Sequence, residues 1–331
     1  MPMKPDRNLG LELLRVTEAA ALGAARWVGR GQKESGDGAA VDAMRLMLGT
    51  VEMDGMIVIG EGEKDEAPML YNGEMVGSGN GAPCDVAVDP VEGTNLLAKG
   101  LPNSIAVIAV APRGAMWNPG PAFYMDKLVV GPEAAGKVDL DAPVKDNLEA
   151  IAKAKGISVQ EVTVVLLERT RNEGKIRELR EAGARIRLIS DGDVAPALMS
   201  ALPDTGVDAV MGIGGTPEGV ITACAVLGLG GEMQGRLAPQ SDDERKRVLE
   251  AGYDLSHKLT HSELVSNQDT FFAATGITHG SFLGGVNYTR TGATTTSLVI
   301  RSHSGTWRKV QSHHKWEKLS KISAIPYHKE Q

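Results

Sequence analysis

One segment constrains the fold of this chain more than any other: residues 85–94, with the sequence DVAVDPVEGT. Val86 and Val88 alternate with a small residue as in a buried strand. Pro90 has no N–H to donate, which predicts that the strand ends there. Asp89 is therefore expected at the carboxyl end of the strand, where open α/β sheets bind ligands. The segment predicts an α/β sheet with acidic side chains at its ligand-binding edge.

Two carboxylates, Asp89 and Glu92, lie close together in this segment. Hard cations such as Mg²⁺ take oxygen ligands and are usually held by a few carboxylates together with a substrate phosphate. Both side chains are therefore candidate metal ligands, and the Val91 carbonyl is another. Gly93 and Thr94 are expected to open a helix whose free N–H groups face an anion. The alternative is a strand-to-turn junction in which the two acids only cap backbone donors.

A second acidic cluster follows another apolar run, at residues 56–59. Glu61 comes directly after this predicted strand and is flanked by glycines, which allow a close approach of the backbone. Glu63, Asp65 and Glu66 follow at once, and like charges so close repel one another unless a cation or solvent relieves them. For these three acids the alternative is a solvated, charged loop.

Asp37 precedes a periodic run of apolar residues that predicts a helix. Its plainest role is the N-cap of that helix, and the functional alternative is a metal ligand or a group that orients an attacking water. Lys33 lies four residues earlier, where it either neutralises a phosphate or pairs with Glu34. These residues make the amino-terminal part of the chain a candidate catalytic region.

The remaining pattern is mixed α/β, with no internal repeat. Strands are also predicted at residues 105–111, 128–130, 162–167 and 186–189. Helices are predicted at residues 9–28, 146–154, 175–182 and 194–202, the first capped by Asp6 or Asn8, and a loop at residues 112–123. Ser241 and Glu244 have the spacing of a capping box. We expect two domains, residues 1–140 with the metal site and residues 141–331 with the substrate-binding residues.

Two arginines, Arg169 and Arg171, follow the strand predicted at residues 162–167. The planar guanidinium fork suits phosphate, and the alternative is a pair of surface arginines that cover apolar neighbours. Asp191 and Asp193 end the next strand, where they are able to cap the following helix.

The turn GIGGTPEG, at residues 212–219, differs from a dinucleotide-binding loop because Pro217 occupies the third glycine position. Thr216 is the predicted N-cap of a helix, with Pro217 at its first position and Glu218 in its first turn. There the Glu218 carboxylate either compensates the helix dipole or faces the metal site. Gly215 leaves room for a substrate beside the backbone.

Taken together, these segments resemble the class II fructose-1,6-bisphosphatases, the bacterial GlpX-like branch of the lithium-sensitive sugar phosphatases. The resemblance runs along nearly the whole chain, as far as the segment GITHG at residues 276–280. It implies a layered αβαβα sandwich and a divalent metal, Mg²⁺ or Mn²⁺. It implies metal ligation by Asp37, Glu61, Asp89, Glu92 and Glu218.

The resemblance also implies roles around the substrate. Thr94 is expected to orient or activate the attacking water, with Asp37, Glu61 and Lys33 in the catalytic group. Arg169 and Arg171 are expected to hold the distal phosphate. The expected substrate contacts are Glu92, Gly93, Thr94, Tyr124, Lys127, Arg169, Arg171, Asp191, Gly192, Asp193 and Gly215. Thr170 and Asn172 differ from the Pro and His of better-known members, which leaves the fine substrate preference open.

Bulk properties agree with such an enzyme. The net charge of −7 argues against nucleic acid as the main partner. The two cysteines, Cys84 and Cys224, form no disulfide framework, so a cytoplasmic protein is expected. No apolar stretch approaches the roughly 18 residues of a membrane span, and the charged amino terminus is no signal peptide. For the basic segment 301–331, packing of its tryptophans against a second subunit is preferred to metal or nucleic-acid binding. A homo-oligomer, dimer or tetramer, is expected.

The sequence therefore predicts metal-dependent hydrolysis of fructose 1,6-bisphosphate to fructose 6-phosphate and phosphate, a step of gluconeogenesis. A close alternative is sedoheptulose 1,7-bisphosphate, or both substrates. A monophosphatase of the inositol or nucleotide type is a more distant alternative, and it would not need Arg169 and Arg171. A non-catalytic anion-binding module would lack one of the expected acids, yet all are present.

Overall fold

The computed structural model describes residues 8–62 and 69–322. Asp6 and the acidic residues Glu63, Asp65 and Glu66 lie outside the described residues, so the predictions for them stay predictions. Within the described part, the strands form a large sheet and a smaller one. The large sheet contains β1 (Asp54–Ile59), β2 (Met75–Val76), β3 (Pro83–Glu92), β4 (Ile105–Pro112), β10 (Phe271–Gly276), β11 (Asn287–Thr289), β12 (Gly292–Arg301) and β13 (Thr306–Lys315). The small sheet contains β5 (Tyr124–Val130), β6 (Thr163–Leu167), β7 (Arg185–Ile189), β8 (Ala209–Gly215) and β9 (Glu232–Leu237).

The order of the strands in the large sheet is β11-β12-β10-β4-β3-β1-β2, and β13 also pairs with β12. The order in the small sheet is β7-β6-β8-β5-β9. The helices are α1 (Gly10–Ala24), α2 (Lys33–Leu48), α3 (Thr94–Lys99), α4 (Val144–Lys155), α5 (Glu173–Glu181), α6 (Val194–Ala201), α7 (Thr216–Leu229), α8 (Asp242–Glu250), α9 (His261–Leu264) and α10 (Trp316–Ile322). Most predicted helices and strands are confirmed, with shifts of a few residues at their ends.

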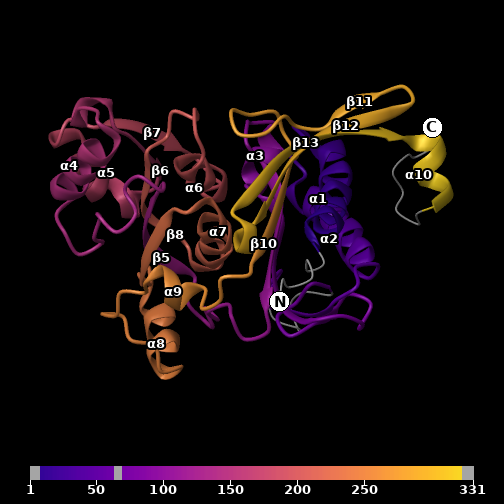
Figure 1. Ribbon diagram of the computed structural model, residues 1–331, viewed down its shortest axis with the longest axis horizontal. Coiled ribbons are helices and arrows are strands. Elements are labelled where there is room, and N and C mark those ends of the chain that lie inside the picture. Colours follow the sequence, from indigo (N-terminus) through magenta and orange to yellow (C-terminus); the bar gives the residue numbers. More distant parts are fainter. Residues whose placement is uncertain (1–7, 63–68, 323–331) are drawn as a thin grey trace, which may run out of the picture.

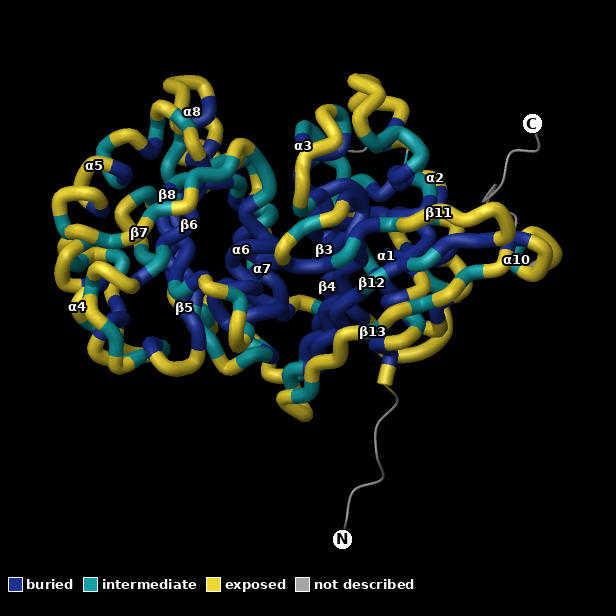
Figure 2. Tube along the Cα trace, turned by 90° about the horizontal axis from the view of Figure 1, so that it is seen from above, coloured by how far each residue is buried: buried dark blue, intermediate teal, exposed yellow. Residues whose placement is uncertain are grey.

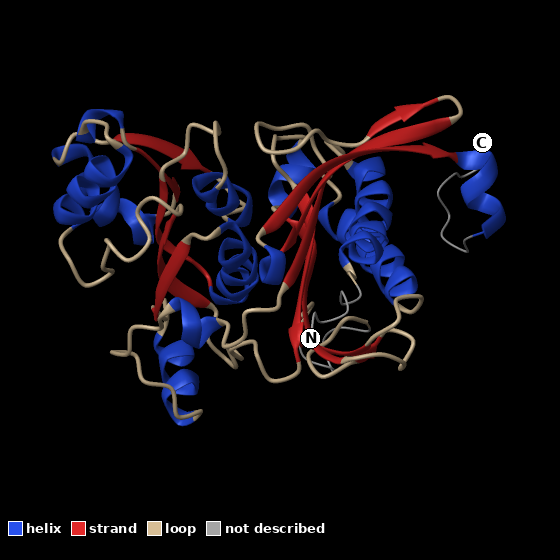
Figure 3. Ribbon diagram, viewed as in Figure 1, coloured by secondary structure: helices blue, strands red, loops and turns tan. Residues whose placement is uncertain are grey.

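These elements stack in layers (Figure 1, Figure 3). α4 and α5 cover the outer face of the small sheet, α6 and α7 lie between the two sheets, and α1 and α2 cover the far face of the large sheet. The mixed α/β class and the layered αβαβα arrangement expected from the resemblance are confirmed. The first helix ends earlier than expected, at Ala24, and a 3₁₀ turn continues to Trp27.

The central helix layer is apolar on all sides because it is covered by a sheet on each side. Every residue of α6 is buried, and so are most residues of α7. Figure 2 shows this layer and the neighbouring strands β3 and β4 as the most buried part of the chain. None of the helices in the described residues is both long and apolar enough to cross a bilayer.

The expectation that Pro90 ends its strand is wrong. β3 continues to Glu92, and its antiparallel pairing with β4 shifts register between Asp89, opposite Val107, and Glu92, opposite Ile105. Three steps on β3 therefore match two on β4, which is a β-bulge. The missing N–H of Pro90 falls in this bulge, where it costs no ladder hydrogen bond.

Parallel pairing brings the strand ends together. β1 and β3 are parallel neighbours, so Glu61, which follows β1, lies at the same edge of the sheet as Asp89. In the small sheet β6 is parallel to both β7 and β8, so Arg169, Asp191 and Glu218 all follow the same edge. β5 is antiparallel to β8 and places Tyr124 opposite Gly215.

The strands do not divide at residue 140. β5 comes before that point yet belongs to the small sheet, and β10, β11, β12 and β13 come after it yet belong to the large sheet. Each half of the chain therefore contributes strands to both sheets. The predicted domain boundary between residues 140 and 141 stays a prediction.

The end of the described chain packs on the chain itself. β13 pairs with β12 along its whole length, and Trp316 is buried with its ring 6.2 Å from that of Tyr288. The expectation that both tryptophans face a second subunit is therefore wrong for Trp316, since apolar contacts within the chain already cover it. Trp307 is exposed, and its expected role stays a prediction.

Glu244 of α8 ties that helix to the start of β5. Its buried carboxylate accepts the N–H groups of Phe123 (2.8 Å), Tyr124 (3.1 Å) and Gln240 (2.8 Å). The Ser241 hydroxyl accepts the N–H of Glu244, so that half of the expected capping box is confirmed. The Glu244 side chain instead secures the strand that carries Tyr124 and Lys127.

Replacing Glu244 with Ala leaves three backbone donors without their acceptor. We expect the free energy of unfolding to fall by about 3 kcal/mol, because hydrogen bonds to a charged group are worth more than neutral ones and buried donors are costly to leave unpaired. Urea unfolding measures the change. Asp243→Ala is the control, since Asp243 is exposed in the same helical turn; an equal loss in both variants would contradict the assignment.

Candidate active site

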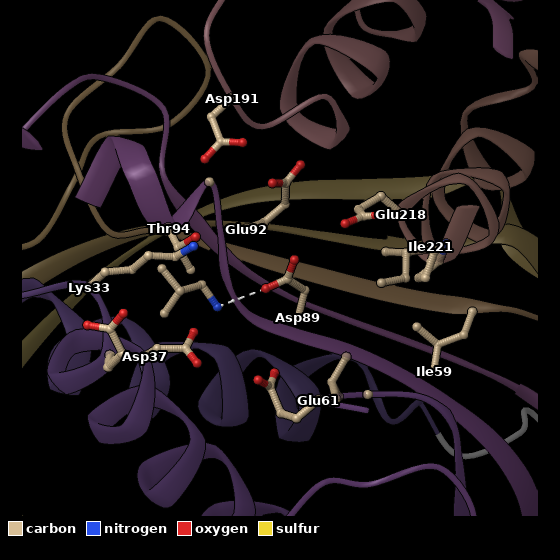
Figure 4. A pocket seen from close by; sticks show the side chains of 16 residues that line it. Lys33, Asp37, Ile59, Glu61, Asp89, Glu92, Thr94, Asp191, Glu218 and Ile221 are labelled. Carbon is tan, nitrogen blue, oxygen red and sulfur yellow. Dashed lines mark hydrogen bonds between the residues drawn. The ribbon is translucent and has the colours of Figure 1, made fainter. Parts of the chain in front are cut away.

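A pocket of about 480 Å³ lies between the sheets' ligand-binding edges (Figure 4). It is built from the ends of β1 and β3 and from the first turns of α2, α3 and α7. All five predicted acidic ligands line it, together with four other predicted site residues: Asp37, Glu61, Asp89, Glu92 and Glu218, with Lys33, Gly93, Thr94 and Asp191. Glu34 also lines it, although the sequence suggested only a partner for Lys33.

Asp37 lies inside a helix and is not its N-cap, so that expectation is wrong. α2 begins at Lys33 with Gln32 as its cap, one turn earlier than predicted. Gly36 allows close helix packing, since a Cβ there would lie 2.5 Å from the Leu97 side chain. Lys33 therefore sits on the same helical face as Asp37, four residues away.

The carboxyl groups of Asp37 and Glu61 are close enough to influence each other's pKa. Burial, and then the charge of Asp37, raise the pKa of Glu61 to about 7. Burial also raises the pKa of Asp37, while the ammonium group of Lys33 opposes that rise. Glu61 therefore keeps its proton to a higher pH than an exposed carboxyl group would.

Asp89 and Glu92 lie deeper, at the bulge of β3. Asp89 Oδ1 accepts the N–H of Val91 at 3.0 Å (Figure 4), and Glu92 Oε1 accepts the N–H of Val194 at 2.8 Å. The capping role that the sequence left open is thus present for one oxygen of each acid. Burial raises the pKa of both carboxyl groups well above the usual range, and neighbouring carboxylates raise it further. For Asp89 these neighbours are Glu92, Glu218, Glu61 and Asp37.

Glu218 enters the pocket from the first turn of α7. The cap of that helix is Gly215, one residue before the expected Thr216. A Cβ at Gly215 would lie 1.8 Å from Glu218 Oε2, so only glycine leaves room for this carboxylate. Burial raises the pKa of Glu218, and Lys127 opposes the rise. Glu218 Oε2 is a buried atom with no hydrogen-bond partner among the described residues.

These acids share one pocket, but they do not converge on one point. In the described residues, no three His, Cys, Asp or Glu side chains are arranged to hold one ion together. Several carboxylate oxygens are instead turned toward backbone N–H groups or toward one another. The donor set itself consists of oxygens, which hard divalent cations prefer, and a cation would offset the mutual repulsion that raises these pKa values.

The residues expected around the distal phosphate lie outside the lining of this pocket. The guanidinium of Arg171 lies over the Tyr124 ring at 4.5 Å, and its Nε donates to the Ile213 carbonyl at 3.1 Å. Arg169 is turned toward its neighbour, with Nη1 donating to the Glu168 carbonyl at 3.3 Å. Arg171 is therefore held by an aromatic face and a carbonyl, which matches neither a free surface arginine nor an ion pair.

Lys127 and Asp193 form a buried ion pair at 2.7 Å. The expectation that Asp193 caps α6 through its side chain is wrong, because the Glu92 carboxylate takes the N–H of Val194 instead. Asp191 accepts the N–H of Asn95 at 3.1 Å. Gly192 has a φ of +74°, which favours glycine, and it lies against Glu92.

Sequence reasoning missed two polar residues near Arg171. Lys175 of α5 forms an ion pair with Asp126 at 2.8 Å, and Asn172 is buried among backbone groups. For Lys175, the available signal was its partner Asp126, a charged residue next to Lys127 in a predominantly apolar strand. Asn172 stood out only as a departure from the expected family pattern.

The raised pKa of Glu61 makes the stability of the metal-free protein depend on pH. Glu61 has an ordinary pKa of 4.5 and a pKa of about 7 when folded, so the folded state holds more protons between these values. Its contribution to the free energy of unfolding therefore falls as pH rises, by about 3 kcal/mol in total.

The measurement compares wild type with Glu61→Gln in urea, with chelator, from pH 4.5 to 8. We expect the variant to become progressively more stable relative to wild type as pH rises toward 7. Comparing the two proteins cancels the opposite contribution of His261 and His314, whose pKa values burial lowers. A difference that stays constant across this range would contradict the assignment.

Comparison with known proteins shows the family of this chain. The family model described as "Bacterial fructose-1,6-bisphosphatase, glpX-encoded" matches residues 7–314. The "Fructose-1,6-bisphosphatase 1 class 2" of Escherichia coli (strain K12) is 45% identical over 321 residues, which cover 93% of this chain and 95% of the relative. The class 2 fructose-1,6-bisphosphatases of Escherichia coli O6:H1 and Shigella flexneri match equally well. With its fold and carboxylate pocket, this chain belongs to the bacterial, glpX-encoded fructose-1,6-bisphosphatase family.

Proposed function

We propose that this protein hydrolyses fructose 1,6-bisphosphate to fructose 6-phosphate and phosphate, the step that gluconeogenesis requires. Membership of the family supports this activity, because the family match covers most of the chain. The observation that carries the proposal is the pocket of about 480 Å³ that the five proposed metal ligands line together with Lys33 and Thr94. A buried acidic pocket of this kind repels a phosphate unless a cation is present, so the substrate and the metal are expected to bind together.

The residues proposed to hold a divalent cation are Asp37, Glu61, Asp89, Glu92 and Glu218. When bound, Mg²⁺ or Mn²⁺ supplies Lewis-acid stabilisation of the phosphoryl group and a more acidic water. Thr94 directly follows the Gly93 cap of α3 and is proposed to orient the attacking water. Lys33 lines the same pocket and is proposed to neutralise negative charge on the scissile phosphate.

The far end of the substrate is proposed to bind at the edge of the small sheet. Arg169, Arg171 and Tyr124 form the distal phosphate site, and Asp191, Gly192, Asp193 and Gly215 contact the sugar. The ion pair between Lys127 and Asp193 supports a role for Lys127 in holding that carboxylate. In this arrangement the bound substrate reaches from the large sheet, where the scissile phosphate binds, to the small sheet, where the distal phosphate binds.

We also propose a cytoplasmic location and a homo-oligomer. Cys84 and Cys224 are both free and buried, which supports a cytoplasmic protein. The proposed partner is the small sugar bisphosphate alone, and a homo-oligomer, dimer or tetramer, is proposed without a defined interface. Comparing kcat/KM for fructose 1,6-bisphosphate and sedoheptulose 1,7-bisphosphate decides between the two sugars.

Asp89→Asn tests the metal site. The amide keeps the shape of the carboxylate but removes the charge that a cation needs, so kcat/KM should fall about a hundredfold or more while the fold persists. Phosphate release at saturating Mg²⁺ or Mn²⁺ measures the change, and urea unfolding checks the fold. Asp146→Asn, at an exposed position of α4, is the matched control. Normal turnover by Asp89→Asn would contradict the assignment.

The double variant Arg169→Ala/Arg171→Ala tests the distal phosphate site. Charge-assisted hydrogen bonds to the second phosphate should be lost, so kcat/KM for the bisphosphate should fall about a hundredfold. The rate on fructose 1-phosphate, which has no second phosphate, should change little. If wild type hydrolyses the two substrates equally well, a monophosphatase becomes the better assignment.

A further inference from the structure

Asn172 directly follows Arg171 and is only 1% exposed. Its Oδ1 accepts the N–H of Ile213 at 2.7 Å. Its Nδ2 donates to the carbonyl of Ile213 at 3.2 Å and to that of Leu167 at 3.0 Å. Both ends of the amide are therefore bonded to backbone, as a neighbouring strand would be.

This amide links two strands beyond the point where they pair directly. β6 and β8 are paired in parallel at Val164 with Ala209 and at Val165 with Val210. Asn172 then joins the last residue of β6 to Ile213, farther along β8. Gly212 makes the approach possible, since a Cβ there would lie 2.8 Å from Asn172 Oδ1.

The same carbonyl of Ile213 also accepts a hydrogen bond from Nε of Arg171, at 3.1 Å. The Tyr124 ring supports the face of that guanidinium, and Tyr124 is itself paired with Gly215 on β8. In the part of the chain that the structure describes, the two terminal nitrogens of Arg171 have no hydrogen-bond partner. The guanidinium of Arg171 is thus held at its Nε by the Ile213 carbonyl and on one face by the Tyr124 ring. Its two terminal nitrogens are left to bind a ligand.

We propose that Asn172 is a positioning residue: its amide locks the segment after β6 onto β8 and so holds Arg171 ready for the distal phosphate of the substrate. This rests on the proposed function, in which Arg171 binds that phosphate. The position requires an acceptor for one N–H and donors for two carbonyls, and an amide supplies both. A carboxylate would set a negative oxygen against two carbonyl oxygens, although its size is the same.

The test compares Asn172→Asp and Asn172→Ser with wild type in the full-length enzyme. We expect the KM for fructose 1,6-bisphosphate to rise about tenfold with kcat nearly unchanged, because the cost lies in ordering Arg171 and not in the reacting groups. With fructose 1-phosphate as substrate, kcat/KM should stay within about twofold of wild type. Asn172→Ser keeps the proposal testable if the aspartate variant does not fold.

Asn147 of α4 offers a matched control. It too is a buried Asn, and its Oδ1 and Nδ2 bond the N–H (2.8 Å) and the carbonyl (2.7 Å) of one residue, Asp139. Asn147→Asp should lower stability in the same way but leave both KM values unchanged. Combining Asn172→Asp with Arg171→Ala should add little to the effect of Arg171→Ala alone, since the amide acts through that arginine.

Three outcomes would overturn the proposal. An unchanged KM for the bisphosphate in both Asn172 variants would do so, and so would an equal loss of kcat/KM on both substrates, which indicates a general structural role. If Arg171→Ala raises the KM for the bisphosphate and the Asn172 variants do not, only the positioning role is lost. If Arg171→Ala itself has no effect, the distal phosphate assignment fails, and the positioning role fails with it.

Discussion

Repulsion between carboxylates is the constraint on which the rest of the site depends. The Asp89 carboxylate is repelled by the charges of four other acids, and burial removes the water that would screen them. These acids are Glu92, Glu218, Glu61 and Asp37. The chain can hold these groups together only because rigid elements carry them. Two come from β3, one from the turn after β1, and one each from α2 and α7. Folding therefore stores an electrostatic penalty, and a cation bound among these groups would relieve it and so stabilise the folded state.

The layered fold explains how one substrate is proposed to meet two sheets. The carboxyl ends of β1 and β3 supply acids, while the edge of the small sheet supplies guanidinium groups and amides. α7 starts in the pocket with Glu218 and then runs between the sheets, so it connects both halves through one buried element. Arg169 and Arg171 lie outside the lining of the acidic pocket, whereas Lys33 lines it.

Much of this could be predicted from the sequence, because apolar periodicity and strand-end acids are local signals. The strands that carry Glu61 and Asp89 and the helices that begin at Thr94 and near Glu218 were all expected. Other features depend on distant partners. Pro90 sits in a bulge that only the pairing of β3 with β4 creates, and Gly36 beside Asp37 allows a close contact with Leu97. The return of β10 to the large sheet and the pairing of Lys127 with Asp193 are likewise set by tertiary packing.

The central helix layer has one further consequence. α6 and α7 touch a sheet on each side and have almost no surface in water. Sliding one sheet past the other would open gaps in a close-packed interior, which loses dispersion contacts at once. The two halves are therefore expected to move as one body during the catalytic cycle. Any adjustment that admits substrate or releases phosphate falls to short segments at the rim, such as the one that precedes α2.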